Sequence, residues 1–211
     1  MEISLIFALI SAIIYLSGFI PYIYHVYHGR VVPHPFSWSV WAIVSSINTL
    51  ALIGNTDTYF SLLSPLVRTS CLIIGGVIGW TLIRKIRINM FDYTCLILAM
   101  FTVGIAYFYG IEKAIIPTIL IDLLVLSPTL KKIWIDPASE DMIAWITTAI
   151  SQFFLLLSLG TFVIDVALFW IYIMSVNAGV AAFIFSRARY MRTWKYRLQK
   201  FFSIIAFKKK L

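Results

Sequence analysis

Apolar segments, each about as long as one membrane crossing, follow one another along the chain and are separated by short polar stretches. About 20 consecutive apolar residues form one helical crossing of the hydrocarbon core of a membrane. We therefore predict an all-α integral membrane protein with seven transmembrane helices. The predicted spans are Ser4 to Val26, Phe36 to Ile53, Tyr59 to Ile83, Phe91 to Tyr109, Ala114 to Ile133, Met142 to Leu159 and Phe162 to Phe185.

Composition supports this interpretation. Of the 211 residues, 61% are hydrophobic and 12% are charged, whereas a soluble globular domain carries about 25% charged residues. Cys71 and Cys95 both lie in apolar segments without CxxC spacing and are interpreted as small buried residues. The composition excludes an ordinary soluble globular protein.

The basic residues predict the orientation. If the N-terminus lies outside, the cytoplasmic segments hold 15 of the 17 Lys and Arg residues, against Lys113 outside and Arg68 within a span. The 15 are Arg30, then Arg84, Lys85 and Arg87, then Lys131 and Lys132, then Arg187, Arg189, Arg192, Lys195, Arg197, Lys200, Lys208, Lys209 and Lys210. Cytoplasmic loops are enriched in basic residues, so we expect an external N-terminus and a cytoplasmic C-terminus. This asymmetry accounts for the net charge of +8 without a nucleic-acid partner.

Two similar stretches indicate an internal duplication. Trp38 follows Pro21 by 17 positions, and Trp145 follows Pro128 by 17 positions. Hydrophobic segments before and after each proline align at the same offset of 107 residues. Such self-similarity at a fixed period is typical of repeated structural units.

A three-helix repeat ends on the side of the membrane opposite to its start, so a parallel second copy requires one additional crossing. We therefore predict a 3+1+3 arrangement of two parallel three-helix bundles, a repeat type that occurs in transporters. Residues 1–86 form the first bundle, 87–112 the linker helix, 113–187 the second bundle and 188–211 a basic tail.

Small residues in the third and seventh spans favour close helix packing. Gly75 and Gly79 form a GxxxG pattern. A cluster at the equivalent place under the offset of 107 consists of Ser175, Ala178, Gly179 and Ala182. Small residues let membrane helices approach closely, so both clusters are predicted to pack against neighbouring helices.

The chain resembles the SWEET-like and PQ-loop superfamily of small-solute transporters, in a bacterial-type subgroup. The resemblance covers the span pattern and two motifs, although the Pro-Gln pair of the family reads Pro21-Tyr22 and Pro128-Thr129 here. The segment PHPFSWSVW is similar to that of the bacterial subgroup. The resemblance implies a prokaryotic inner-membrane transporter with alternating access, in which Pro21 and Pro128 act as hinges; a static kink at each proline is the alternative.

Two charged side chains fall within the predicted spans. Arg68 lies about 14 Å and Asp122 about 12 Å below the outer ends of their helices, which is a similar depth. Charged side chains in a membrane face the interior of a bundle and mark substrate or proton pathways. We expect Arg68 and Asp122 to line a substrate site, with facilitated or proton-coupled transport through Asp122. A structural ion pair between them is the alternative.

Amides in three spans complete the predicted substrate site: Asn48, Gln152 and Asn177. A central cavity needs a few polar groups among aromatic walls, and the family places tryptophan and asparagine there. Asn177 matches best, with Ser70 as its equivalent in the first bundle. Interhelical hydrogen bonding is the alternative for each amide. Trp38 and Trp145 are interpreted as interfacial anchors first and gate residues second.

Nothing in the sequence indicates an enzyme. The chain has no HExxH, GxSxG or Walker motif and no pair of carboxylates within one span. His25 and His28 share a helix face near His34, but no Cys or carboxylate completes a metal site locally. We expect no cofactor and no metal.

The tail is the basis of a second hypothesis. Residues 190–207 alternate basic and apolar positions at helical spacing, which predicts an amphipathic helix on the anionic inner leaflet. The alternative is a non-transporting receptor or assembly factor that binds a cytoplasmic partner through residues 190–211. The expected partners are thus a small polar solute and membrane lipid, and the chain is compatible with a homo-oligomer.

Overall fold

The computed structural model describes residues 2–31, 33–55, 59–82, 89–159 and 164–208. Every regular element in these residues is helical, and none of them forms a β-strand. The α-helices are α1 (Glu2–Tyr27), α2 (Pro35–Asn55), α3 (Leu63–Thr81), α4 (Met90–Tyr109), α5 (Ile111–Ile135), α6 (Met142–Ser158) and α7 (Ile164–Lys208). Short 3-10 helices, η1 (Tyr59–Leu62) and η3 (Pro137–Ser139), precede α3 and α6.

The helices confirm the predicted apolar segments. Among the described residues, six helices are long and apolar enough to cross a membrane, and α6 is an apolar helix of 17 residues. At 1.5 Å per residue, α6 is about 26 Å long, slightly less than the roughly 30 Å hydrocarbon core. The chain is therefore a helical membrane protein. The predicted ends at Ile83 and Phe162, the boundary between residues 86 and 87, and Arg84, Lys85 and Arg87 lie outside the described residues.

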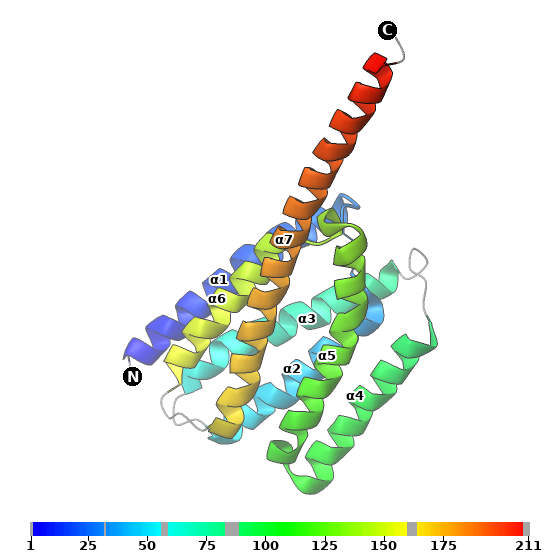
Figure 1. Ribbon diagram of the computed structural model, residues 1–211. Helices are drawn as coiled ribbons and strands as arrows, with labels where there is room; N and C mark the ends of the chain where they lie inside the picture. The colour runs from blue at the N-terminus through cyan, green and yellow to red at the C-terminus, as the bar shows by residue number, and fades with distance from the viewer. Residues whose placement is uncertain (1, 32, 56–58, 83–88, 160–163, 209–211) are drawn as a thin grey trace.

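Six helices form a closed ring, and α4 lies outside it. Around the ring the helices in contact are α1, α3, α2, α5, α7 and α6, and α6 returns to α1. Helix α4 packs against α5 and α2, at the edge of the molecule in Figure 1. Exchanging α1 with α5, α2 with α6 and α3 with α7 leaves the order around the ring unchanged.

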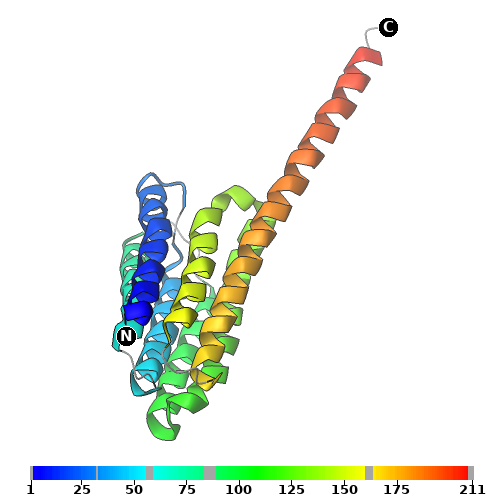
Figure 2. The ribbon, with the colours of Figure 1, turned by 90° about the vertical axis from the view of Figure 1, so that its left-hand side faces the viewer.

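The two ends of the bundle differ. The α1–α2 and α5–α6 connections lie at the end from which α7 extends, and the N-terminus lies at the other end (Figures 1 and 2). We call these the C-terminal end and the N-terminal end. The basic residues Arg30, Lys131 and Lys132 therefore lie at the same end as the basic part of α7.

Helix α7 continues far beyond the bundle. Its 45 residues extend about 68 Å, more than twice the thickness of a hydrocarbon core. The predicted tail helix is thus an uninterrupted continuation of α7 (Figure 2). The boundary predicted between residues 187 and 188 falls inside this helix, and residues 209–211 lie outside the described residues. At Arg187 the helix is held to the end of α5, because the guanidinium lies 4.1 Å from the Trp134 ring centre and Nε donates to the Trp134 carbonyl at 2.7 Å.

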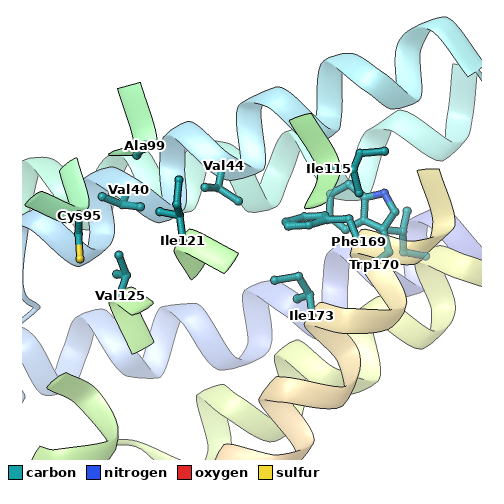
Figure 3. Packing of buried hydrophobic residues seen from close by; sticks show 11 residues of the cluster. Val40, Val44, Cys95, Ala99, Ile115, Ile121, Val125, Phe169, Trp170 and Ile173 are labelled. Atoms are coloured by element: carbon teal, nitrogen blue, oxygen red, sulfur yellow. The ribbon is translucent and has the colours of Figure 1, made fainter. Parts of the chain in front are cut away.

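The largest apolar core joins α2, α4, α5 and α7 (Figure 3), and Leu155 of α6 also belongs to it. Its labelled residues are Val40 and Val44 from α2, Cys95 and Ala99 from α4, Ile115, Ile121 and Val125 from α5, and Phe169, Trp170 and Ile173 from α7. Cys71 and Cys95 are buried and free. This core holds the outer helix α4 against the ring.

Burial repeats along the chain at the predicted offset of 107 residues. In α6 the buried positions and their buried equivalents in α2 are Ala149 and Ala42, Ser151 and Val44, Gln152 and Ser45, Leu155 and Asn48, and Ser158 and Ala51. In α1 and α5 the pairs of buried residues include Ala8 and Ile115, Ser11 and Thr118, Tyr15 and Asp122, and Val26 and Ile133. Equivalent faces of these helices therefore point into the bundle.

The third helix of each half follows a different register. Buried residues of α3 match buried residues of α7 at an offset of 105: Ser64 and Phe169, Pro65 and Trp170, Arg68 and Ile173, Leu72 and Asn177, Gly75 and Val180, Gly76 and Ala181, and Gly79 and Ile184. The offset therefore falls by two between the second and third helices. The predicted equivalence of Asn177 with Ser70 is wrong, because Ser70 is exposed whereas Asn177 is buried.

The offset of 105 explains why the predicted cluster of small residues in α7 is exposed, whereas the glycines of α3 are buried. Gly75 and Gly79 are buried, as predicted, against Trp38 and against the backbone of Pro33 and Pro35. The four residues of the predicted α7 cluster are all exposed within this chain: Ser175, Ala178, Gly179 and Ala182. Their predicted packing against a neighbouring helix is therefore wrong, since they occupy the outward face of the ring.

Candidate functional site

A cavity of about 490 Å³ lies between the two sets of helices and opens toward the C-terminal end, where residues of both connections line it. It is lined by α1, α2 and α3 on one side and by α5, α6 and α7 on the other. The connections at the C-terminal end contribute Arg30, Pro33 and His34 from the α1–α2 connection, and Ser139 and Glu140 from the α5–α6 connection. A volume of this size is typical of sites for small molecules.

The two sides of the cavity use equivalent positions. Every residue of α1 and α2 that lines it has an equivalent residue in α5 or α6 that also lines it, 107 residues later. The pairs are Tyr15 and Asp122, Phe19 and Leu126, Tyr22 and Thr129, Ser37 and Ala144, Trp38 and Trp145, and Trp41 and Thr148. In the third helices Arg68 and Leu72 pair with Ile173 and Asn177 at the offset of 105. The lining is thus repeated in position but differs in chemistry between the two sides.

Aromatic side chains form much of the cavity wall. The Trp41 ring lies 6.1 Å from that of Trp38 and 6.2 Å from that of Trp145, measured between ring centres. Tyr22 and Phe19 contact Trp38 in turn, at 5.2 and 6.4 Å. Trp38 and Trp145 both belong to the cavity wall. Because Trp38 is only 9% exposed, its interpretation as an interfacial anchor first is wrong, whereas that of Trp145 stays a prediction.

The two intramembrane charges lie on opposite sides of the cavity lining. Arg68 of α3 and Asp122 of α5 are both buried and both line it. The Tyr172 hydroxyl of α7 donates to Asp122 Oδ2 at 2.6 Å. Among the ion pairs of the described residues, none joins Arg68 to Asp122. The structure therefore brings both charges to one cavity, as expected for a substrate site, and does not form the alternative ion pair.

The three predicted amides separate into two groups. Asn177 lines the cavity, and its Nδ2 donates to the Ile173 carbonyl at 2.7 Å. Asn48 does not line it, and its Nδ2 donates to the Val44 carbonyl at 2.8 Å and to Thr118 Oγ1 at 3.4 Å. Gln152 is fully buried outside the cavity, and its amide has no hydrogen-bond partner in the described part of the chain. Asn48 therefore follows the alternative of interhelical bonding, and neither it nor Gln152 lies in the predicted site.

Beyond the cavity, polar contacts close the N-terminal end. Ser11 Oγ of α1 donates to the Ser151 carbonyl of α6 at 2.6 Å, and lies 3.1 Å from Ser151 Oγ and 2.5 Å from Ser64 Oγ of α3. Ser11, Ser64 and Thr118 each precede a cavity-lining residue by four positions, which is about 6 Å along the helix. These contacts, with that of Asn48 and Thr118, form a layer one turn from the cavity, which we call the N-terminal seal.

A close approach of α1 and α6 lies at the depth of the cavity, at Gly18 between the lining residues Tyr15 and Phe19. A Cβ atom at Gly18 would overlap the side chain of Thr147, so glycine is needed for the two helices to pack at this distance. His25 Nδ1 and Asp141 Oδ2, 2.8 Å apart, join α1 to the start of α6 at the C-terminal end. Asp141 also caps α6, where its Oδ1 accepts from Ile143 N–H at 2.9 Å. This carboxylate gives His25 an interhelical partner that its local sequence does not reveal.

Charged groups surround the mouth of the cavity. Lys132 Nζ and Glu140 Oε1 lie 2.8 Å apart, and His34 Nε2 lies 3.7 Å from Asp92 Oδ1. Asp92 also closes the capping box of α4, where it accepts from Asn89 N–H at 2.8 Å. Burial lowers the pKa of His34 below its ordinary value of 6.5; the Asp92 carboxylate opposes this shift, and the charge of Lys132 adds to it.

This shift predicts how acid affects stability. Because the pKa of His34 is lowered in the folded protein, the unfolded chain binds the proton more readily, and stability is lost as the pH falls below 6.5. We expect the thermal midpoint of the purified protein to fall on acidification, and to fall less in His34→Gln. Parallel melting curves of the two proteins from about pH 8 to about pH 5 measure the difference. Identical pH dependence in both would contradict this assignment.

Several residues of the site were not identified from the sequence. Four of them line the cavity: Tyr15, Phe19, Trp41 and Thr148. A fifth, Tyr172, does not line the cavity but donates a hydrogen bond to Asp122, which does. The offset of 107 was the available signal, because applying it to Asp122 leads to Tyr15. The two predicted hinges lie inside α1 and α5, each next to a lining residue, Tyr22 or Thr129.

Comparisons of the chain with models of protein families, with curated proteins and with solved structures find no match.

Proposed function

We propose that the protein is a membrane carrier, similar to SWEET-like transporters, that moves a small polar solute by alternating access between two parallel three-helix units. In this proposal α1 to α3 form one unit, α4 is the linker helix and α5 to α7 form the other, so that the chain crosses the membrane seven times. With the N-terminus outside, the cavity faces the cytoplasm. The solute binds in the cavity, with Arg68, Asp122 and Asn177 as its polar partners.

The observation that carries this proposal is the cavity itself, which is open at one end, sealed at the other and lined by equivalent positions of two sets of helices. A carrier of this kind exposes one site to each side in turn by rocking one repeat against the other. Two repeats that meet at a central site have two interfaces, and each has polar contacts at the sealed end. Ser11 contacts Ser151 at the α1–α6 interface, and Asn48 contacts Thr118 at the α2–α5 interface.

The ring order supports the 3+1+3 arrangement. It is unchanged when the first three helices are exchanged for the last three, as expected for two copies related by an axis along the membrane normal. Pro21 and Pro128 occupy equivalent positions and are proposed as the hinges. Each removes a backbone donor inside a long helix, which lowers the resistance to bending at that point.

A matched pair of variants tests the site. A solute at a hundredfold excess over its Kd stabilises the folded protein by about 2.7 kcal/mol. We expect one class among sugars, nucleosides, amino acids and organic ions to raise the thermal midpoint of the parent, and Asn177→Ala to abolish that rise. Asn48→Ala is the control, because Asn48 and Asn177 each bond the carbonyl four residues earlier but only Asn177 lines the cavity.

Flux of the same solute into proteoliposomes separates transport from binding alone. Equal loss of stabilisation in both variants would remove Asn177 from the site. Binding without flux would instead favour the second hypothesis.

That second hypothesis is a receptor or assembly factor acting through its tail, and the length of α7 favours it. The helix continues to Lys208 beyond the bundle, far enough to contact a cytoplasmic partner. Binding to the anionic inner leaflet remains a prediction, and it requires a bend that turns α7 into the membrane plane. Deletion of residues 190–211 is expected to leave the flux of a carrier measurable and to abolish the function of a receptor.

A further inference from the structure

The deepest cation of the cavity has no acceptor for two of its nitrogen atoms. Arg68 lines the cavity and is 6% exposed. Its Nε and Nη1 are buried and have no hydrogen-bond partner in the described part of the chain. Tyr15 is a side-chain hydrogen-bond partner of the guanidinium, so the cost of burial falls on Nε and Nη1, whose donors have left water without finding an acceptor. Such a group is held ready for an acceptor that comes from outside the chain.

The carboxylate that shares this depth of the cavity with Arg68 is hydrogen-bonded to another residue. Asp122 lines the same cavity, but its Oδ2 accepts from the Tyr172 hydroxyl at 2.6 Å. No ion pair between Asp122 and Arg68 occurs among the described residues. Asp122 therefore acts on Arg68 through its charge and not through a direct ion pair, and Nε and Nη1 of Arg68 remain available for a ligand.

The charges of the whole lining favour an anion of low charge. Three cationic side chains, Arg30, Arg68 and Lys132, share the lining with two carboxylates, Asp122 and Glu140. Lys132 and Glu140 neutralise each other at 2.8 Å. One excess positive charge remains, which matches a monoanion such as a carboxylate. A phosphate carries up to two negative charges, which is more than the single excess positive charge of the lining.

The walls favour a flat apolar body. Trp38, Trp41 and Trp145 lie in a chain of edge-on contacts, and Phe19 and Tyr22 continue it on α1. Aromatic rings pack with one another in stacked or edge-to-face arrangements. The cavity is large enough for one or two fused rings with a short acidic arm.

We propose that the solute is a small aromatic carboxylate, whose carboxylate accepts from the Arg68 guanidinium and whose ring lies among the three tryptophans. This inference rests on the proposed central site and adds the chemical class of its ligand. Charge-assisted hydrogen bonds to a guanidinium are stronger than those to a neutral acceptor, so the matching amide of the same acid should bind weakly.

The test uses three acids and their amides on the intact, detergent-purified protein: benzoate and benzamide, 4-hydroxyphenylacetate and 4-hydroxyphenylacetamide, and indole-3-acetate and indole-3-acetamide. We expect at least one acid to raise the thermal midpoint and to bind about tenfold to a hundredfold more tightly than its amide. Arg68→Gln should abolish this preference, and Arg68→Lys should retain part of it. Asp122→Asn should strengthen binding of the acid, because it removes the competing negative charge.

The amide comparison on the parent protein needs no variant, so poor folding of the Arg68 variants leaves the test intact. Equal binding of an acid and its amide, binding of amides alone, or binding of none of the acids overturns the inference. None of these outcomes contradicts the carrier proposal, because flux of another class of solute can still support it. If an acid binds to the site but is not transported into proteoliposomes, the inferred class of ligand is supported and the carrier proposal is contradicted.

Discussion

Oxidation of the double variant Ser11→Cys/Ser151→Cys is expected to reduce solute flux to background. The two hydroxyl oxygens lie 3.1 Å apart across the contact between α1 and α6, which is within the reach of a disulfide once both residues are cysteine. In the proposed carrier these helices belong to different units and must separate at the N-terminal seal before the cavity can open to that side. A covalent bond between them holds the seal closed, and a reductant should restore the flux.

The same serine supplies the control. Ser64 Oγ lies 2.5 Å from Ser11 Oγ, but α3 and α1 belong to the same proposed unit. Oxidised Ser11→Cys/Ser64→Cys should therefore retain flux, because units that rock as rigid bodies do not change their internal contacts. Both pairs are made in a background in which Cys71 and Cys95 are replaced by alanine, since these are the free cysteines of the described chain. Equal flux in the two cross-linked proteins would show that α1 and α6 stay together during transport.

Solute binding gives this experiment a second measurement. The cavity opens at the other end of the bundle, so cross-linking the seal leaves it accessible from that end. We expect the cross-linked protein to keep the thermal stabilisation by solute while its flux is lost. Loss of both would indicate that the disulfide distorts the site instead of locking one state.

The apolar helices and the burial of Arg68 and Asp122 could be predicted from the sequence, because each depends on one-dimensional information. The length of an apolar segment predicts one membrane crossing. The equal spacing from Pro21 to Trp38 and from Pro128 to Trp145 predicts that these residues occupy equivalent positions in two repeats. Arg68 and Asp122 could be assigned to an interior cavity because the lipid-facing alternative is so costly.

The faces of the helices could not be predicted in the same way. In lipid, both the inward and the outward face of a helix are apolar, so hydrophobic periodicity does not identify the buried side. For this reason the sequence assigns Asn48 and Gln152 to a cavity that they do not line, and makes Trp38 an interfacial anchor although it is buried in the cavity wall. The shift of the repeat offset from 107 to 105 arises in the connections between the second and third helices of each half, where the apolar pattern carries no register.

The offset of 105 between α3 and α7 has its clearest structural consequence at Gly75. A Cβ atom there would overlap the six-membered ring of Trp38, and the ring is held in place by its contacts with Tyr22, Phe19 and Trp41. The equivalent position in α7 is Val180, which is buried and has a branched side chain, so the two halves pack their third helices differently. The close approach of α3 to α2 therefore depends on the absence of a side chain at residue 75.

Gly75→Ala is expected to destabilise the protein by about 1 to 3 kcal/mol, the usual range for overpacking of a well-packed interior. Because Trp38 also lines the cavity, the displaced ring should weaken solute binding in the same variant. Thermal unfolding with and without solute measures both effects. Gly179→Ala is the matched control: it lies in the predicted equivalent cluster, but its Cβ would meet nothing within 4 Å. Alanine has the higher helix propensity, so this control should melt at the same temperature as the parent or slightly above it. An equal loss in the two variants would contradict the register of 105 and the close contact that follows from it.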